Sequence, residues 1–459
     1  MEQYEAYLNA QQDRLLSELF QLYAIPSISA LSEHAQDVRR AALWVRDRLE
    51  TAGLEHAQVL ETGGHPVVYA DWLHAPGRPT ALFYGHMDTQ PVDPIEQWNH
   101  PPFEPFVDGD RIYARGASDD KGSLMIAVAA LEALLATRSS LPINVKVLFE
   151  GQEEIGSPQL GEFIANHVEM LACDVVINVD SGQFSETEPG VVVGLKGICA
   201  LELEVRGPDH DVHSGSYGGA IQNPLHALAR LVDSMHSPDG KVSVRGFYSD
   251  VAQLTEQDVT AIEAVPYDEQ AYMEDLGVTE LFGEPGYTTR QRAWARPTLE
   301  VNGMWGGFTG AGTKTVIPSA AWAKITCRLV PNQDPAQVLA AIKAHIVRHT
   351  PAGTQVTVRT TESGSPAYLV PVDDPYLQAA VEVLRDFYGQ EPYLERSGGS
   401  VPVTTQFKKY LGVYAIGFGF GLPDERVHSP NEFFRKSSFR KGQSAICRLL
   451  DRLALPLGD

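Results

Sequence analysis

The chain has 459 residues, of which 43% are hydrophobic and 21% are charged, and its formal net charge is −23. This composition is typical of a soluble globular protein, and the length exceeds what one hydrophobic core usually supports, so we expect two domains. A strongly acidic chain without a cluster of basic residues lacks the positive surface that nucleic acids and anionic membranes require, and we expect neither as a partner.

The first part of the chain alternates between helix and strand patterns. Its longest apolar run, residues 124–136, contains Glu132 and is too short to span a bilayer, so it predicts a core helix. Strands separated by helices predict an α/β fold with a mostly parallel sheet flanked by helices. The predicted elements are helices at 5–23, 33–51, 121–137 and 158–167 and strands at 66–73, 80–85, 143–149 and 174–179.

The pattern changes near residue 190. Residues 191–207 suggest antiparallel strands around a glycine turn. The stretch 250–297 is polar and carries no chemistry that we can assign. Its Trp294 and Tyr287 are candidates for packing or for substrate contact. The rest of this part predicts an α+β unit, with helices at 223–235 and 335–349 and strands at 298–305, 320–330 and 354–361.

The helix and strand rhythm resumes from residue 374 and ends in a predicted helix at 432–453, with Asn431 as a candidate N-cap. The simplest arrangement is a catalytic domain made from both chain ends, residues 1–189 and 368–459, with a smaller α+β domain inserted at 190–367.

Four cysteines lie far apart in apolar surroundings, which favours buried, reduced thiols and an intracellular, cytoplasmic enzyme. They are Cys173, Cys199, Cys327 and Cys447. The polar, acidic N-terminal stretch does not have the pattern of a signal peptide.

Five short segments with acidic or histidine residues each follow an apolar, strand-like stretch. Open α/β sheets build their active sites at such strand ends. The segments are ALFYGHMD (81–88), ARGASDDKG (114–122), VKVLFEGQEEIGS (145–157), DVVINVDS (174–181) and ERVHSPNE (425–432).

The side chains in these segments form a nitrogen and oxygen ligand set suited to borderline divalent metals such as zinc, manganese or cobalt. Their number exceeds what one tetrahedral site needs, so we expect two metals that share a bridging carboxylate, with one carboxylate left as a proton carrier. The set consists of His86, Asp88, Asp119, Glu153, Glu154, Asp180 and His428.

Each motif also has a plainer interpretation. A lone HMD is weak evidence for a metal, Asp120 fits as a helix cap, and a loop histidine such as His428 is usually only solvated. The adjacent Glu153 and Glu154 are harder to explain in this way. They directly follow an apolar strand, and two neighbouring carboxylates repel each other when both are ionised. We therefore predict Glu154 as a metal ligand and Glu153 as the general base.

With these motifs in their observed order, the chain resembles the co-catalytic di-metal peptidase family that includes aminoacylases, carboxypeptidase G, succinyl-diaminopimelate desuccinylase and carnosinase-type dipeptidases. Four further segments are similar to the cytosolic non-specific dipeptidase and carnosinase branch, as is the Asp at position 180. They are DHDVHSGSYGG (209–219), FTGAGTKTVIP (308–318), RLVP (328–331) and RSGGSVPVT (396–404).

The resemblance implies one metal held by His86, Asp119 and Asp180 and a second held by Asp119, Glu154 and His428. It also implies that Asp88 orients His86. The peptide bond between Asp119 and Asp120 is expected to be cis. The same resemblance implies a homodimer in which His213 of the inserted domain stabilises the oxyanion, with that domain acting as lid and dimer interface. The expected ligands of the substrate carboxylate are Arg328, Thr315, Gly399 and Ser400. A plainer interpretation of Arg328 is an ion pair on a solvated strand face.

The expected activity is hydrolysis of the amide bond of dipeptides, with two divalent metal ions per subunit, most simply zinc. An N-acyl-amino-acid deacylase that uses the same metals is the alternative. A metal-binding or scaffold protein with a dead site would have lost a ligand or the base, and this chain has lost neither.

Overall fold

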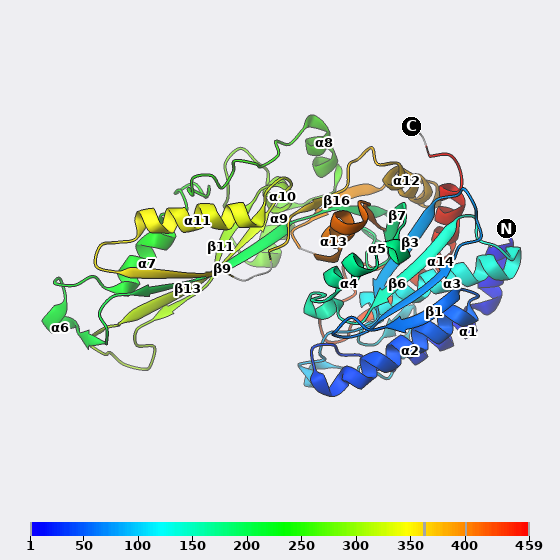
Figure 1. Ribbon diagram of the computed structural model, residues 1–459, viewed down its shortest axis with the longest axis horizontal. Helices are drawn as coiled ribbons and strands as arrows, with labels where there is room; N and C mark the ends of the chain where they lie inside the picture. Colours follow the sequence, from blue (N-terminus) through cyan, green and yellow to red (C-terminus); the bar gives the residue numbers. More distant parts are fainter. Residues whose placement is uncertain (1, 361–363, 400–401, 458–459) are drawn as a thin grey trace. The chain divides into compact units, whose positions relative to one another are not determined.

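The computed structural model describes residues 2–360, 364–399 and 402–457 (Figure 1). The chain divides into two compact units. The first unit contains Met1–Val193, Val370–Glu395 and Val401–Asp459, and the second contains Gly194–Leu369 and Arg396–Ser400.

A six-stranded sheet forms the centre of the first unit. Its strands, in spatial order, are β1 (Glu55–Leu60), β2 (Val67–Trp72), β6 (Asn144–Glu150), β3 (Thr80–His86), β7 (Val175–Asn178) and β17 (Ala415–Gly417). The pairs β6–β3, β3–β7 and β7–β17 are parallel, and the pairs β1–β2 and β2–β6 are antiparallel. The predicted α/β class with a mostly parallel sheet is confirmed.

The central strands are buried along nearly their whole length. Every residue of β2 and β7 is buried, and in β3 and β6 only the first residue is partly exposed. A strand with no exposed side chain has both faces covered, as parallel sheets require. The helices of this unit are α1 (Gln3–Tyr23), α2 (Ala35–Thr51), α3 (Gly122–Arg138), α4 (Leu160–Asn166), α5 (Val168–Leu171), α12 (Pro375–Tyr388), α13 (Pro402–Leu411) and α14 (Lys436–Leu453).

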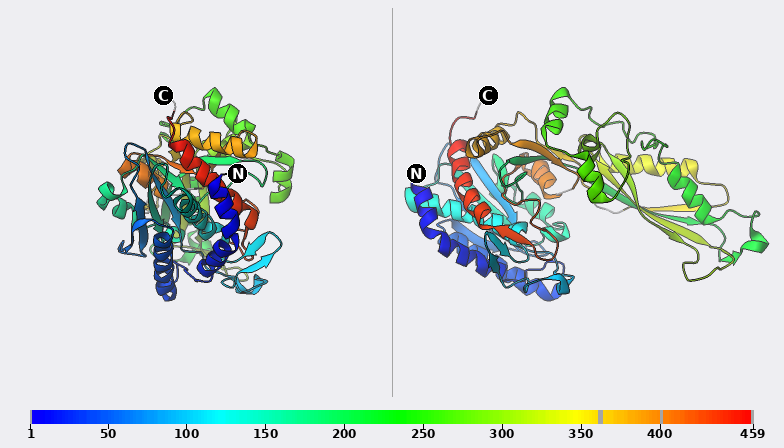
Figure 2. Two further views of the ribbon diagram at one scale, coloured as in Figure 1. Left: turned by 90° about the vertical axis from the view of Figure 1, so that its right-hand side faces the viewer. Right: turned by 180° about the vertical axis from the view of Figure 1, so that it is seen from behind.

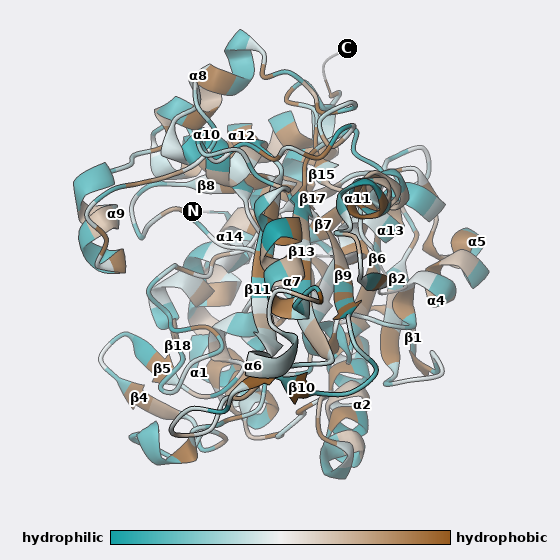
Figure 3. Cartoon of the chain, turned by 90° about the vertical axis from the view of Figure 1, so that its left-hand side faces the viewer, coloured by the Kyte–Doolittle hydropathy of each residue, from teal (hydrophilic) through white to brown (hydrophobic). Residues whose placement is uncertain are grey.

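Helix α3 follows the apolar run of the sequence and is buried from Gly122 to Leu134. Helices α1 and α14 pack against it, so the two ends of the chain meet on one core helix (Figure 2). Helix α2 instead has one buried stripe, with Val38, Val45 and Leu49 inward at the spacing of an amphipathic helix, and it carries both hydrophilic and hydrophobic residues along its length (Figure 3).

The second unit is built on a four-stranded antiparallel sheet in the order β11 (Thr298–Gly306), β13 (Ala320–Leu329), β9 (Gly197–Arg206) and β14 (Gln355–Thr360). Strand β13 alternates between buried and more exposed residues, as its sequence predicts. Helices α7 (Pro224–Asp233) and α11 (Pro335–His349) pack on the sheet and close an apolar core. Three short elements of this unit are β10 (Val212–His213), α6 (Ser214–Tyr217) and β12 (Val316–Ile317).

Several local predictions were wrong. Strands β8 (Gly190–Leu195) and β9 do not form a hairpin, because β9 pairs with β13 and β14 while Leu195 of β8 pairs with β15 (Tyr368–Leu369). The last helix starts at Lys436 rather than 432, because Phe433–Arg435 forms strand β18 beside β5 (Arg111–Tyr113).

Other elements were not predicted. The polar stretch 250–297 contains three short helices, and two further strands lie at a sheet edge and beside β5. They are α8 (Glu256–Ala264), α9 (Glu269–Leu276), α10 (Thr289–Ala295), β1 and β4 (Phe106–Asp108). Strand β16 (Tyr393–Ser397) completes the set of strands. None of the helices in the described part of the chain combines the length and the apolar composition that crossing a membrane needs.

Candidate metal centre and active site

The candidate ligands of the first unit come from the carboxyl ends of neighbouring parallel strands. His86 is the last residue of β3, Glu154 lies in the short helix η4 (Glu153–Ile155) just after β6, and Asp180 follows β7. Because β6, β3 and β7 are adjacent in the sheet, these side chains emerge at one edge, the usual place of an α/β active site. Asp119 and His428 reach the same place from the turn η3 (Ala117–Lys121) and from the loop before β18.

Asp119 lies between the two histidines. Its Oδ1 is 2.9 Å from His86 Nε2, and its Oδ2 is 2.9 Å from His428 Nε2. Asp180 Oδ2 lies 3.8 Å from His86 Nε2, and Glu154 Oε2 lies 3.1 Å from His428 Nε2. Each carboxylate oxygen of Asp119 therefore faces a different histidine, which is the arrangement expected of a bridging ligand.

The structure thus brings together two groups of three side chains, and in each group the ligand atoms lie within 4.8 Å of one another. One group is His86, Asp119 and Asp180, and the other is Asp119, Glu154 and His428. These are the same two trios that the sequence resemblance implies.

The electrostatics of this cluster favour cations. Burial raises the pKa of Asp180 to about 7, and the negative charge of Asp119 adds to the rise. Hydrogen bonds to Asp119 and Glu154 raise the pKa of His428 to about 10, so in the metal-free protein a proton sits between the imidazole and the carboxylates. A divalent cation can replace that proton, and imidazole with carboxylate is a donor set that zinc, manganese and cobalt accept. The residues therefore fit a two-metal centre.

Asp88 is fully buried and connects two of the ligand segments. Its backbone carbonyl lies in hydrogen-bond contact with His86 Nδ1 at 3.1 Å, its Oδ1 lies 3.4 Å from the same nitrogen, and this Oδ1 accepts the backbone N–H of Glu153 at 3.2 Å. Its Oδ2 accepts the N–H of Glu154 at 3.1 Å. Histidine ligands are commonly oriented by such a second acceptor, and here Asp88 holds the imidazole through its backbone carbonyl and the turn that carries the two glutamates through its carboxylate.

Glu153 points into the same buried, acidic environment. Burial raises the pKa of its carboxyl to about 9, and the negative charges of Asp180 and Glu150 contribute to the rise. A carboxyl whose pKa is displaced this far, beside a ligand cluster, has the properties of a proton-transfer group.

The sequence analysis missed Glu432, which holds the loop that carries Asp119. Its buried carboxylate accepts backbone N–H groups from Gly116 at 2.9 Å, Ser118 at 2.9 Å and Asp119 at 3.1 Å, and it pairs with buried Arg115 at 2.8 Å. The available signal was its place at the end of the RVHSPNE segment.

A second missed residue is Gln90, four positions beyond His86. Its backbone N–H donates to Glu154 Oε1 at 3.1 Å, and its side-chain amide donates to Oε2 at 2.8 Å. No motif in the sequence marks this residue.

Two capping predictions near the site were wrong. Asp120 does not cap α3; it is fully buried, and its Oδ2 accepts the backbone N–H of His86 at 3.1 Å. Asn431 is not the N-cap of α14; its side-chain oxygen accepts the N–H of Asn99 at 2.7 Å. The Asp119–Asp120 peptide is cis, as predicted.

A cavity of about 310 Å³ opens beside the ligand cluster within the first unit. Asp119 and Asp180 form one side, and Val192, Glu395 and Val427 contribute to the remainder. The cavity has room for a small substrate group next to the two carboxylates.

The other predicted site residues belong to the second unit, and their part in substrate binding stays a prediction. His213 is exposed, its Nδ1 accepts the N–H of Gly215 at 3.0 Å, and its Nε2 lies 3.4 Å from Thr315 Oγ1. Arg328 is partly buried on β13, and the N–H of Gly399 donates to Ser397 Oγ at 3.0 Å. Ser400 lies outside the described residues.

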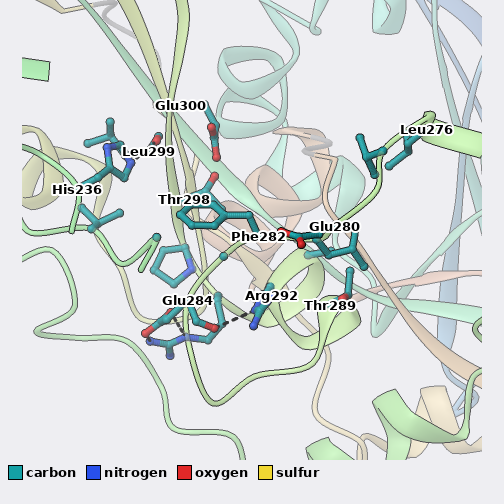
Figure 4. Close-up of a pocket in the computed structure, with 18 of the residues that line it drawn as sticks. His236, Leu276, Glu280, Phe282, Glu284, Thr289, Arg292, Thr298, Leu299 and Glu300 are labelled. Carbon is teal, nitrogen blue, oxygen red and sulfur yellow. Dashed lines mark hydrogen bonds and ion pairs between the residues drawn. The ribbon is translucent and has the colours of Figure 1, made fainter. Parts of the chain in front are cut away.

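The stretch 250–297 takes part in a separate cavity of about 520 Å³ in the second unit (Figure 4). Glu284 and the buried Arg296 form a bidentate ion pair in its wall. The guanidinium of Arg296 also stacks on Tyr287 at 4.4 Å, and that of Arg290 stacks on Trp294 at 4.6 Å. Both aromatic residues that the sequence analysis singled out are therefore engaged in packing.

The chain matches a known peptidase family. The model of peptidase family M20/M25/M40 matches residues 82–452. The chain is 29% identical to the Cys-Gly metallodipeptidase dug1 of Schizosaccharomyces pombe over 97% of both chains. It is 28% identical to the human Beta-Ala-His dipeptidase over 95% of this chain and 89% of that one.

Among solved structures, the chain is similar to the M20 family metallo-carboxypeptidase Sso-CP2 of Sulfolobus solfataricus, with 33% identity and a TM-score of 0.83. The match covers 96% of this chain and 99% of that one. The resemblance inferred from the motifs is confirmed.

Proposed function

The chain belongs to peptidase family M20/M25/M40, and on that premise we propose that it is a metal-dependent dipeptidase. The observation that carries the proposal is the position of Asp119 between His86 and His428, with Asp180 and Glu154 completing two ligand trios. The relatives from Schizosaccharomyces pombe and human, which match along nearly the whole chain, are named dipeptidases.

The proposed ligands are His86, Asp119 and Asp180 for one metal and Asp119, Glu154 and His428 for the other. Two divalent cations bound there would act as Lewis acids toward water and the scissile carbonyl, and their charge would favour the ionised form of Glu153.

Glu153 is the proposed general base. It takes a proton from the attacking water and returns it to the amine that leaves, so one carboxylate serves both halves of the hydrolysis. Asp88 fixes the positions of Glu153 and His86 through hydrogen bonds of its carboxylate to Glu153 and of its backbone carbonyl to His86. The side-chain nitrogen of Lys121 donates hydrogen bonds to the carbonyls of Leu22 and Ile25, which anchors the loop that carries Asp119.

The second unit supplies the rest of the proposed site. In this proposal, His213 from the inserted domain of a partner subunit donates a hydrogen bond to the oxyanion, so the active enzyme is a homodimer. The inserted domain, residues 190–367, also closes over the substrate as a lid. Arg328, with Thr315, Gly399 and Ser400, binds the terminal carboxylate, because a guanidinium matches a carboxylate with two parallel hydrogen bonds.

We further propose zinc as the metal, with manganese or cobalt as substitutes, and the cytoplasm as the location. All four cysteines are free, which agrees with a reducing compartment.

The test is release of amino acids from free dipeptides and from matched N-acetyl amino acids, after metal removal and after return of zinc or manganese. Cleavage of the unblocked dipeptides, restored by metal, is the expected result. Failure of metal to restore any cleavage would overturn the proposal.

One observation favours a second candidate. The similar structure with 33% identity is described as a metallo-carboxypeptidase, which fits removal of a C-terminal amino acid from an acylated or longer substrate by the same metals. Cleavage of the N-acetyl compounds with the free dipeptides spared would select this carboxypeptidase or deacylase activity.

A further inference from the structure

A second cluster of ligand-type side chains lies at the edge of the six-stranded sheet. Glu55 and His56 on β1 and Asp71 on β2 place one ligand atom each within 4.8 Å of one another. His56 Nδ1 is 2.8 Å from Asp71 Oδ1, and His74, just after β2, has its Nε2 2.9 Å from Glu55 Oε2. One imidazole and two carboxylates therefore gather on one strand pair, and His74 contacts the cluster through Glu55.

The backbone explains how two successive residues contribute to the same cluster. In a regular strand Glu55 and His56 would point to opposite faces of the sheet. The pairing of β1 with β2 is irregular between Glu55 and Gln58, and His56 has a φ of 51°, in the left-handed region that non-glycine residues rarely adopt. The bulge redirects His56 toward Asp71, a recognised use of such irregularities.

The carboxylate at the centre of the cluster is held in place. Asp71 is only 6% exposed, and its Oδ2 accepts a hydrogen bond from Tyr69 OH at 2.8 Å. Lys146 lies opposite Asp71 on β6, but its ammonium donates to the carbonyl of Ala172 at 2.7 Å. Asp71 Oδ1 therefore faces His56, while the other oxygen is fixed from behind, as a second partner usually fixes a metal-bound carboxylate.

We propose that Glu55, His56 and Asp71 form a third divalent-cation site, of the zinc class, with water as the fourth donor. Zinc is bound by histidine nitrogen and carboxylate oxygen, and three protein ligands with one water complete a four-coordinate site. A cation there would tie the exposed edge strand β1 to the buried strand β2 and would take no part in hydrolysis.

The test is equilibrium dialysis of the whole chain against buffered free zinc, with metal content measured per chain. His56→Ala is the test variant, and because His56 is exposed its loss leaves the core intact. His34→Ala is the matched control, since His34 also pairs with an aspartate, Asp37, at 2.7 Å but belongs to none of the ligand trios found among the described residues.

The expected result is one zinc fewer in His56→Ala than in the wild type and in His34→Ala. In the same samples, cobalt should give the absorption of one additional tetrahedral site in the wild type and in His34→Ala, but not in His56→Ala. Equal metal content in all three proteins would overturn the proposal. Because the readout is the difference between variants, it stands apart from whether the two-metal centre binds zinc or supports dipeptide cleavage.

Discussion

Replacement of Glu432 by glutamine should disable the metal centre without touching a proposed ligand. One carboxylate oxygen of Glu432 accepts the N–H groups of Ser118 and Asp119, and the other accepts the N–H of Gly116 and pairs with Arg115. A glutamine must turn its NH₂ group toward one of these two pairs of donors, so two charge-assisted hydrogen bonds are lost in either orientation.

A hydrogen bond to a charged group contributes about 1.5–3 kcal/mol, so the expected loss of stability is about 3–6 kcal/mol, reduced by whatever local relaxation occurs. That is a large part of the roughly 5–15 kcal/mol that holds a domain folded. Because Asp119 is one of the residues released, we also expect weaker binding of both metals.

Urea unfolding of the metal-free protein and competition for metal with a chelator measure the two effects. The control is Glu382→Gln, which removes one partner of a surface ion pair with Arg452 and should cost less than about 1 kcal/mol. If Glu432→Gln were as mild as this control in both measurements, the role assigned to Glu432 would be refuted.

Three further predictions concern the same site. Glu153→Gln should keep both metals and lower the turnover by about 10²–10⁴-fold, which is the usual contribution of a general base. The control Glu162→Gln, at an exposed residue, should change neither the metal content nor the turnover. A Glu153→Gln turnover equal to that of the wild type would contradict the assignment. His428→Ala should lose one of the two metals by metal analysis, because Asp119 and Glu154 remain as that trio's only members, while exposed His210→Ala should lose none. Burial raises the pKa of Glu425 from 4.5 to about 7, so the folded state keeps a proton that the unfolded state loses, and Glu425 alone should contribute a loss of about 3 kcal/mol of stability in the metal-free protein as pH rises through that window. Glu425→Gln should flatten this pH dependence in unfolding experiments, and an unchanged slope would assign it to other groups.

The candidate metal centre was predictable because its residues follow apolar strands. His86, Glu154 and Asp180 each come at or just after the end of a parallel strand, and adjacency of those strands in the sheet is enough to bring them together. The residues that were missed act through the backbone: Glu432 and Gln90 hold Asp119 and Glu154 by contacts that depend on how distant loops fold against each other. A local pattern carries no record of such contacts.

The same reasoning explains the errors in the fold. The glycine turn within residues 191–207 suggested a hairpin. In the structure, however, β8 and β9 pair with other strands and belong to different sheets. Helices α8, α9 and α10 have few buried residues, so the sequence has no apolar stripe to mark them; their capping residues Thr255, Asp268 and Thr288 were the available signal.

The division of the first unit between the two ends of the chain has a consequence for synthesis on the ribosome. Domains generally fold as they emerge, and the second unit is almost continuous from Gly194 to Leu369. The first unit has to wait for β17 to border β7 and for α14 to pack on α1 and α3. His428 emerges between those two elements, so the trio that contains it forms late and the nascent chain cannot carry a finished two-metal centre.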